Sequence, residues 1–230
     1  MTIAENLGQI HQRVSQYETQ FERSTNSVNV LAVSKTKPID DIISAYKVGQ
    51  RAFGENYVQE AVDKKKALLH LKDIEWHFIG PIQSNKSRLI AETMDWVHTI
   101  DRSKIASRLN DQRPSNMPLL NVCIQVNISG ESSKSGVTLD ALDELVELVI
   151  KQPNLCLRGL MAIPAPQTSQ AAQIQVYKPL QEVFLALQSK IKTIDTLSIG
   201  MSNDMTAAIA SGSSMVRIGT AIFGARDQHN

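Results

Sequence analysis

The sequence has few cysteines, few aromatic residues and no excess of charge of either sign. Its two cysteines, Cys123 and Cys156, lie far apart and outside any CxxC or Cys–His spacing, which argues against a disulfide framework and a metal site. Because 24 basic residues balance 23 acidic ones, no general attraction to nucleic acid or acidic membranes is expected. No apolar run approaches a membrane span, and no signal-peptide pattern is visible. We therefore expect a cytoplasmic protein in a reducing compartment.

The composition is that of an ordinary folded globule. The 230 residues are 42% hydrophobic and 20% charged, which is enough apolar material for a sizeable core. No internal repeat or low-complexity linker divides the chain, so we expect one domain over residues 1–230. The basic run Lys64-Lys65-Lys66 is most simply interpreted as the solvated face of a helix.

Apolar residues follow two periods along the chain. Steps of four and three from Ile3 to Phe21 predict a long N-terminal helix. Eight strands are predicted at residues 29–35, 51–54, 75–79, 95–99, 119–128, 155–161, 196–199 and 215–218. Helices are predicted after the first seven strands, at 38–48, 56–70, 84–93, 102–111, 139–151, 169–192 and 203–211, with a kink at Pro179.

This alternation of strands and helices predicts an α/β fold. Strands joined through helices pair in parallel by right-handed crossovers, and eight such units most often close into a barrel. We therefore predict a single-domain (β/α)8 TIM barrel with an extra N-terminal helix. A doubly wound open sheet is the alternative, although no GxGxxG follows the first strand to support dinucleotide binding.

Lys35 is the most informative residue in the chain. It follows the strand-forming run Val30-Leu31-Ala32-Val33, and Pro38 opens a helix soon afterwards. Burying a charged lysine side chain there would cost free energy unless its amine bonded to a partner or ligand. The alternative is a surface lysine whose aliphatic stem is buried while its amine stays in water, which is the more common case. Far downstream, Arg217-Ile218-Gly219-Thr220 ends another strand with a cation and a glycine–threonine turn suited to a phosphate.

The predicted barrel brings these two segments together. All strand C-termini of a parallel barrel open onto one face, and the first and eighth strands become neighbours when the barrel closes. The loops after strands seven and eight are the usual phosphate site, where Ser202 is predicted to cap a helix, Gly219 to admit the phosphate and Thr220 to donate a hydroxyl. Arg217 could pair with the phosphate or face a pyridine nitrogen. An amine beside a phosphate cradle predicts a phosphorylated aldehyde, of which pyridoxal 5′-phosphate (PLP) is the commonest.

Four further residues near this face have competing interpretations. His77, in Trp76-His77-Phe78, could line the mouth of the barrel or be a satisfied core histidine. Asn56 follows the second strand and could serve the cofactor or cap the next helix. Lys37 and Lys134 are expected to be solvent-facing lysines at the rim, with a secondary PLP site at either one left open.

The chain resembles the pyridoxal phosphate homeostasis protein family, whose barrel is related to that of alanine racemase. The matching segments cover nearly the whole chain in order: Ala32-Val33-Ser34-Lys35-Thr36-Lys37, Phe53-Gly54-Glu55-Asn56-Tyr57, Trp76-His77-Phe78-Ile79-Gly80-Pro81-Ile82-Gln83-Ser84-Asn85-Lys86, Gly159-Leu160-Met161-Ala162-Ile163-Pro164, Ser198-Ile199-Gly200-Met201-Ser202 and Arg217-Ile218-Gly219-Thr220-Ala221-Ile222-Phe223-Gly224.

This resemblance implies a site and a role. Lys35 would carry PLP as a covalent Schiff base, and Arg217 would hydrogen-bond the pyridine nitrogen. The other cofactor-binding residues would be Asn56, His77, Met161, Ser202, Gly219 and Thr220. Family members are described as cytosolic, usually monomeric regulators of free PLP without an established catalytic activity. PLP-dependent apo-enzymes are candidate recipients of the cofactor.

Two enzyme hypotheses stand beside the regulator. The first is a PLP-dependent amino-acid racemase, which needs a second acid/base opposite the lysine; Tyr57 is a candidate. Against it, an arginine at the pyridine nitrogen donates without protonating the ring and stabilises a carbanion poorly. The second is a Schiff-base aldolase that works without a cofactor. We therefore expect a PLP-binding regulator rather than an enzyme.

Overall fold

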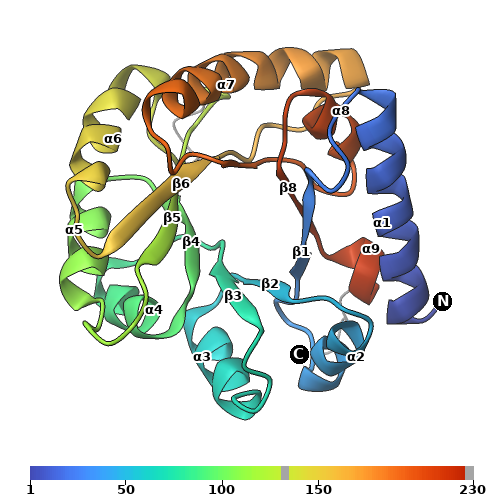
Figure 1. The fold of residues 1–230 in the computed structure, drawn as a ribbon, viewed down its shortest axis with the longest axis horizontal. Helices are drawn as coiled ribbons and strands as arrows, with labels where there is room; N and C mark the ends of the chain where they lie inside the picture. Colours follow the sequence, from blue (N-terminus) through green and yellow to red (C-terminus); the bar gives the residue numbers. More distant parts are fainter. Residues whose placement is uncertain (131–134, 226–230) are drawn as a thin grey trace.

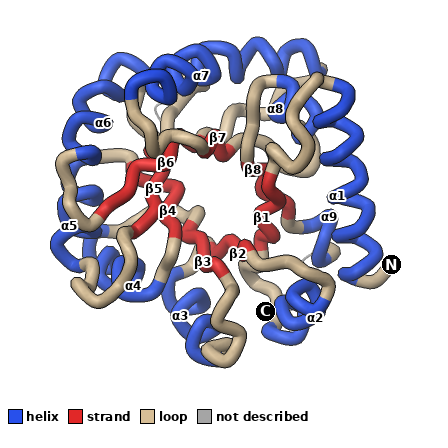
Figure 2. The backbone as a smooth tube through the Cα atoms, viewed as in Figure 1, coloured by secondary structure: helices blue, strands red, loops and turns tan. Residues whose placement is uncertain are grey.

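The computed structural model describes residues 1–130 and 135–225. Within these residues, parallel strands close into a barrel in chain order from β1 to β8 (Figure 2). The strands are β1 (Asn29–Val33), β2 (Ala52–Glu55), β3 (Glu75–Phe78), β4 (Trp96–Ile100), β5 (Leu120–Gln125), β6 (Leu155–Met161), β7 (Thr196–Ser198) and β8 (Met215–Ile218). The predicted (β/α)8 barrel is confirmed, and the open-sheet alternative is wrong because β8 pairs with β1.

The helices form a ring around the strands (Figure 1). They are α1 (Ile3–Gln20), α2 (Ile39–Lys47), α3 (Val58–Ala67), α4 (Ser87–Thr93), α5 (Ser103–Gln112), α6 (Leu142–Ile150), α7 (Gln170–Lys190), α8 (Met205–Ala210) and α9 (Thr220–Phe223), with short 3-10 turns at Ser84–Lys86 and Leu139–Ala141. The predicted N-terminal helix is α1, which begins at a capping box between Thr2 and Glu5. It packs against α2, α8 and α9 (Figure 1).

The main apolar core lies between the barrel and its helices. It includes Phe53 and Phe78 from the strands and Leu7 and Ile10 from α1, all buried. Each large side chain that leaves water here contributes about 1.5–3 kcal/mol. The barrel interior instead holds two small apolar clusters, Leu31–Ile79–Met215 and Trp96–Cys123–Met161, beside buried polar side chains.

Three details differ from the sequence prediction. A short helix, α9, follows β8 where none was predicted. The helix expected at 203–211 begins only at Met205, with Asp204 at its N-cap. The strand expected at 119–128 is shorter, because Val126 forms only an isolated bridge with Val137. Pro179 lies inside α7 without ending it. In the part of the chain that the structure describes, we find no helix with the length and apolarity needed to cross a bilayer.

Candidate functional site

Lys35 and the segment after β8 lie side by side at the C-terminal mouth of the barrel. In the β1–β8 pair, Ala32 lies opposite Ile218. One residue further along, a Cβ added to Gly219 would lie 3.4 Å from the Cβ of Val33. Lys35, half-buried, follows Val33 by two residues. Residues more than 180 positions apart in the sequence therefore share one edge, as the closed barrel required.

The backbone around Lys35 forms a tight turn. The Lys37 amide donates to the Ser34 carbonyl over 3.0 Å, and Thr36 has a φ of 62°, in the left-handed region that non-glycine residues seldom occupy. The Thr36 amide donates to Glu60 Oε1 over 2.6 Å. Ser34 donates its own amide to the Gly54 carbonyl of β2 over 3.0 Å. The turn that carries Lys35 is therefore fixed to β2 and α3.

A buried ion cluster lies beneath this turn. The Lys64 ammonium donates to the Ser34 carbonyl, to Glu55 Oε1 and to Glu60 Oε1 over 2.7, 2.8 and 2.6 Å. The Ser34 hydroxyl donates to the same Glu55 oxygen over 2.6 Å. Burial raises the pKa of Glu55, and the neighbouring Lys64 opposes that shift. The cluster connects α3 directly to the residue that precedes Lys35.

Lys64 corrects the interpretation of the basic run as a solvated face. Its side chain is 6% exposed, whereas Lys66 is exposed as expected. Lys64 falls on the same helical face as the buried residues Ala61 and Leu68, and it stands four residues after Glu60. That spacing indicates an ion pair with Glu60, but it does not show whether the pair faces solvent or the interior.

Arg217 is buried and held by three acceptors. Its Nη1 donates to the Ser198 carbonyl over 2.6 Å and to Ser198 Oγ over 2.8 Å, and its Nη2 donates to the Ala162 carbonyl over 2.9 Å. Burial lowers the pKa of Arg217, but a guanidinium stays charged in proteins. The cation is thus locked in place at the ends of β6, β7 and β8.

His77 and Met161 lie inside the barrel rather than at its rim. The His77 ring is fully buried, stacks on Trp96 with 5.1 Å between ring centres, and places Nδ1 2.9 Å from His98 Nε2. Met161 is fully buried in the cluster with Trp96 and Cys123. Of the two interpretations of His77, the structure therefore favours a core histidine, and its contact with a cofactor stays a prediction.

Asn56 offers an unsatisfied acceptor near the mouth. Its Oδ1 is buried without a hydrogen-bond partner among the described residues, which a bound ligand or a water would supply. Gly80 packs on its backbone so closely that an added Cβ would lie 2.3 Å from the Asn56 carbonyl oxygen. The N-cap of α3 is Tyr57, so Asn56 does not cap that helix.

Ser202 lies in the turn after β7, but it does not cap α8 as predicted. Asp204 occupies the N-cap position, and its carboxylate accepts the Met201 amide over 2.7 Å and the Tyr177 hydroxyl over 2.5 Å. These bonds hold the turn together and delay the helix start to Met205. Ser202 is half-buried in that turn.

The segment Gly219–Thr220 begins α9. The first amides of a helix have no partner within it, so they can donate to an anion together with the exposed Thr220 hydroxyl. Lys37 donates to the Ala225 carbonyl over 2.8 Å, which ties the Lys35 turn to the end of α9. Lys134, the other lysine expected at the rim, lies outside the described residues.

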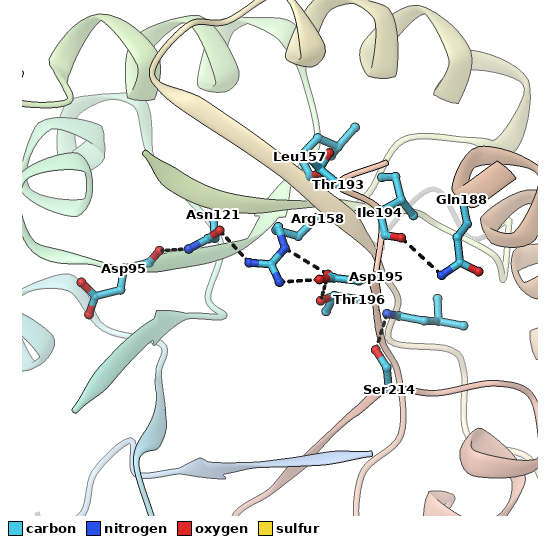
Figure 3. A network of polar contacts seen from close by, with 11 residues as sticks. Asp95, Asn121, Leu157, Arg158, Gln188, Thr193, Ile194, Asp195, Thr196 and Ser214 are labelled. Atoms are coloured by element: carbon cyan, nitrogen blue, oxygen red, sulfur yellow. Dashed lines mark hydrogen bonds and ion pairs between the residues drawn. The ribbon is translucent and has the colours of Figure 1, made fainter. Parts of the chain in front are cut away.

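A polar hollow of about 1100 Å³ lies at the opposite, N-terminal mouth of the barrel. Figure 3 shows Arg158 there between Asn121 and Asp195. Its Nη1 donates to Asn121 Oδ1 over 2.9 Å, and its Nε and Nη2 donate to the Asp195 carboxylate over 3.0 and 2.5 Å. The guanidinium also lies over the Trp96 ring, 4.6 Å from its centre. Arg158 and Asp195 thus already pair with each other in this hollow. Lys35 and Arg217 lie instead at the C-terminal mouth, where the sites of this fold gather.

The sequence is similar to those of a named family over almost its whole length. A family model described as the alanine racemase N-terminal domain matches residues 6–227. The pyridoxal phosphate homeostasis protein of Escherichia coli K12 is 58% identical over 227 residues, covering 98% of this chain and 97% of that protein. The protein of the same name from Vibrio alginolyticus is 58% identical over 229 residues, covering 98% of each chain.

Solved structures agree with this similarity. PipY of Synechococcus elongatus with PLP bound superposes with a TM-score of 0.83 at 32% identity, covering 97% of this chain and all of that one (100%). Alanine racemase from Corynebacterium glutamicum superposes with a TM-score of 0.68 at 17% identity, covering 97% of this chain and 60% of that enzyme. The latter similarity shows the shared barrel fold alone.

Proposed function

The chain belongs to the pyridoxal phosphate homeostasis protein family, and from this premise we propose that it binds PLP through a Schiff base on Lys35 and regulates the supply of free PLP. A role in PLP homeostasis follows from relatives that carry that name over almost the whole chain. The covalent link and the individual contacts are our proposal. The observation that carries it is the juxtaposition of Lys35 with the Gly219–Thr220 turn across the β1–β8 pair.

The residues at the C-terminal mouth fit this cofactor. A phosphate needs donors, and the first amides of α9, the Thr220 hydroxyl and the Ser202 hydroxyl supply them. A pyridine nitrogen needs a donor, and the buried guanidinium of Arg217 is one. The unsatisfied Asn56 Oδ1 is an acceptor that a ligand group or a bound water would complete.

Each site residue then has a distinct task. Lys35 captures the aldehyde, while Ser202, Gly219 and Thr220 hold the phosphate. Arg217 holds the ring nitrogen. Asn56 completes the wall of the site, and contacts of PLP with the buried His77 and Met161 stay predictions. When bound, PLP supplies a reactive aldehyde and an electron-withdrawing ring, and the protein supplies orientation and protection from water.

The site argues for storage rather than catalysis. An arginine at the ring nitrogen donates a hydrogen bond without giving up a proton, so the ring stays a weak electron sink. The relatives are named as homeostasis proteins and not as enzymes, in agreement with the prediction that the chain is not an enzyme. PLP-dependent apo-enzymes as recipients, a monomeric state and a cytoplasmic location remain predictions.

A titration with PLP tests the proposal. Wild-type protein is expected to develop the visible absorbance band of a pyridoxal Schiff base, and Lys35→Ala is expected to abolish it. Lys37→Ala is the matched control, because Lys37 lies two residues away and donates to a backbone carbonyl; it should retain the band. A band that survives Lys35→Ala would move the bond to another lysine. Exchange of a substrate α-hydrogen with solvent deuterium, across a panel of amino acids, would instead favour the racemase alternative.

A further inference from the structure

A column of polar side chains runs through the interior of the barrel from Arg217 to the opposite mouth. Arg217 Nη1 lies 2.8 Å from Ser198 Oγ, and Ser198 Oγ lies 2.8 Å from His98 Nδ1. His98 Nε2 lies 2.9 Å from His77 Nδ1, and His77 Nε2 lies 3.6 Å from Glu75 Oε2. The first four side chains are buried, while that of Glu75 is 59% exposed in the N-terminal mouth.

The chemistry of Arg217 fixes the direction of the first hydrogen bond in this column and favours one direction for the others. A guanidinium can only donate, so Ser198 Oγ accepts from it. Among the contacts that described residues make to this hydroxyl, His98 Nδ1 is the remaining place for its hydrogen. When the hydroxyl donates to His98 Nδ1, that nitrogen is an unprotonated acceptor, and the neutral His98 ring carries its hydrogen on Nε2.

The same reasoning continues to the far end. His98 Nε2 donates to His77 Nδ1, so His77 also carries its hydrogen on Nε2. His77 Nε2 is buried without a hydrogen-bond partner among the described residues, and it lies 3.6 Å from the Glu75 carboxylate, which can only accept. Arg217 at one end can only donate hydrogen bonds, and Glu75 at the other end can only accept them. Both ends are compatible with the same set of histidine tautomers, with the hydrogen on Nε2 of each ring.

Burial favours the neutral form of both imidazoles. Burial lowers the pKa of His98, and the facing His77 and Arg217 lower it further. Burial also lowers the pKa of His77, although Glu75 on its own strand and Asp95 before β4 act in the opposite direction. The His77 ring in turn lowers the pKa of Glu75, which favours the ionised carboxylate that the donor sense requires.

We propose that Ser198 and His98 are positioning residues for Arg217, and that the column from Glu75 to Arg217 is a donor-ordered chain that holds the guanidinium where it meets the cofactor ring. The inference rests on the proposed function for the identity of that ring. Without His98 as an acceptor, the Ser198 hydroxyl would lose the partner that orients it. Without the Ser198 hydroxyl, the partners left to Arg217 among the described residues would be the backbone carbonyls of Ser198 and Ala162.

Nitrogen NMR of the histidine side chains tests the order of the column without any cofactor. We expect His77 and His98 of the PLP-free protein at pH 7 to be neutral with the hydrogen on Nε2. The exposed His11 and His70 provide reference signals from solvent-facing imidazoles in the same spectrum. A hydrogen on His98 Nδ1, or a charged His98 at pH 7, would overturn the donor order. This readout stays informative even if PLP fails to bind.

Variants test the positioning role. His98→Leu and Ser198→Ala are expected to weaken PLP binding about tenfold, the scale of one hydrogen bond to a charged group. They should also change the Arg217 guanidinium resonances of the PLP-free protein. His98→Asn keeps an acceptor near the position of Nδ1, so its PLP affinity should lie within about threefold of the wild-type value. Its Arg217 resonances should return to the wild-type positions. Unchanged Arg217 resonances in Ser198→Ala, or equal losses in the Leu and Asn variants, would contradict positioning and leave a packing role. If wild type itself fails to bind PLP, the proposed function is wrong, and the resonances alone decide the positioning.

Discussion

Replacing Lys64 with methionine should destabilise the protein in a way that depends on pH. Lys64 is the cation of the buried cluster under the Lys35 turn, and its loss strands Glu55, whose side chain is 0% exposed. Removing one partner of a buried pair typically costs about 3–5 kcal/mol. The carboxyl can escape part of this cost by taking up a proton.

Protonation sets an upper limit on the cost of the stranded carboxylate. Neutralising a glutamate of ordinary pKa 4.5 at pH 7 costs about 3.4 kcal/mol, since each unit is worth about 1.36 kcal/mol. At pH 5 the same limit is only about 0.7 kcal/mol. The Ser34 carbonyl also loses its donor, which adds about 1 kcal/mol at either pH. We therefore expect Lys64→Met to cost up to about 4 kcal/mol at pH 7 and about 2 kcal/mol or less at pH 5.

Urea unfolding at pH 5, 6, 7 and 8 measures this difference. Lys66→Met is the matched control, because it removes an exposed lysine from the same helix and should change the unfolding free energy by less than about 0.5 kcal/mol. Adding Glu55→Gln to Lys64→Met removes the stranded charge and should recover about 2 kcal/mol at pH 7. Equal costs for Lys64→Met and Lys66→Met, or a cost that neither pH nor Glu55→Gln alters, would refute the reasoning.

Three further outcomes follow from the structure. Burial lowers the pKa of His98 well below its ordinary 6.5, so at acidic pH the unfolded chain binds a proton that the folded chain does not. The unfolding free energy should therefore fall as the pH drops below about 6.5, by up to about 1.4 kcal/mol per pH unit. The His98→Asn variant should show a smaller dependence on pH. Burial raises the pKa of the Cys123 thiol to about 12, so iodoacetamide should modify Cys156 alone in folded protein and both cysteines in urea, as peptide mass analysis can show. Gly159→Ala would place a Cβ 1.7 Å from a β7 carbonyl oxygen and should cost more than about 4 kcal/mol in urea unfolding, whereas Gly8→Ala in α1, where the Cβ meets no other atom within 4 Å, should gain about 1 kcal/mol.

The barrel could be predicted because its signals are local and repeated. Each strand and helix carries its own apolar period, and the order of the elements leaves few ways to connect them. The closeness of Lys35 to Gly219 then follows from closure alone, without any knowledge of side chains. Both features are therefore set by patterns that a single sequence displays.

The missed features depend on which way a single side chain points. Lys64 reads as a surface lysine until its buried partner Glu55 is known, and helix charge patterns allow either outcome. His98 lies in β4, a strand that is buried on both faces. The sequence therefore places Trp96 and His98 on the same face, but it does not show whether that face lines the barrel interior or packs against the helices. The start of α8 is set by the contacts of Asp204 with the Met201 amide in the same turn and with the Tyr177 hydroxyl of α7, and no local signal reveals the second contact.

Reduction with borohydride after PLP addition, followed by peptide mapping, tests the central claim most directly. The account predicts a pyridoxyl group fixed on Lys35 in the wild-type protein and none on the matched peptide of Lys35→Ala. Protein that stays colourless and unmodified after added PLP would contradict it, and the Lys35 and Gly219 motifs would then belong to a different phosphorylated ligand.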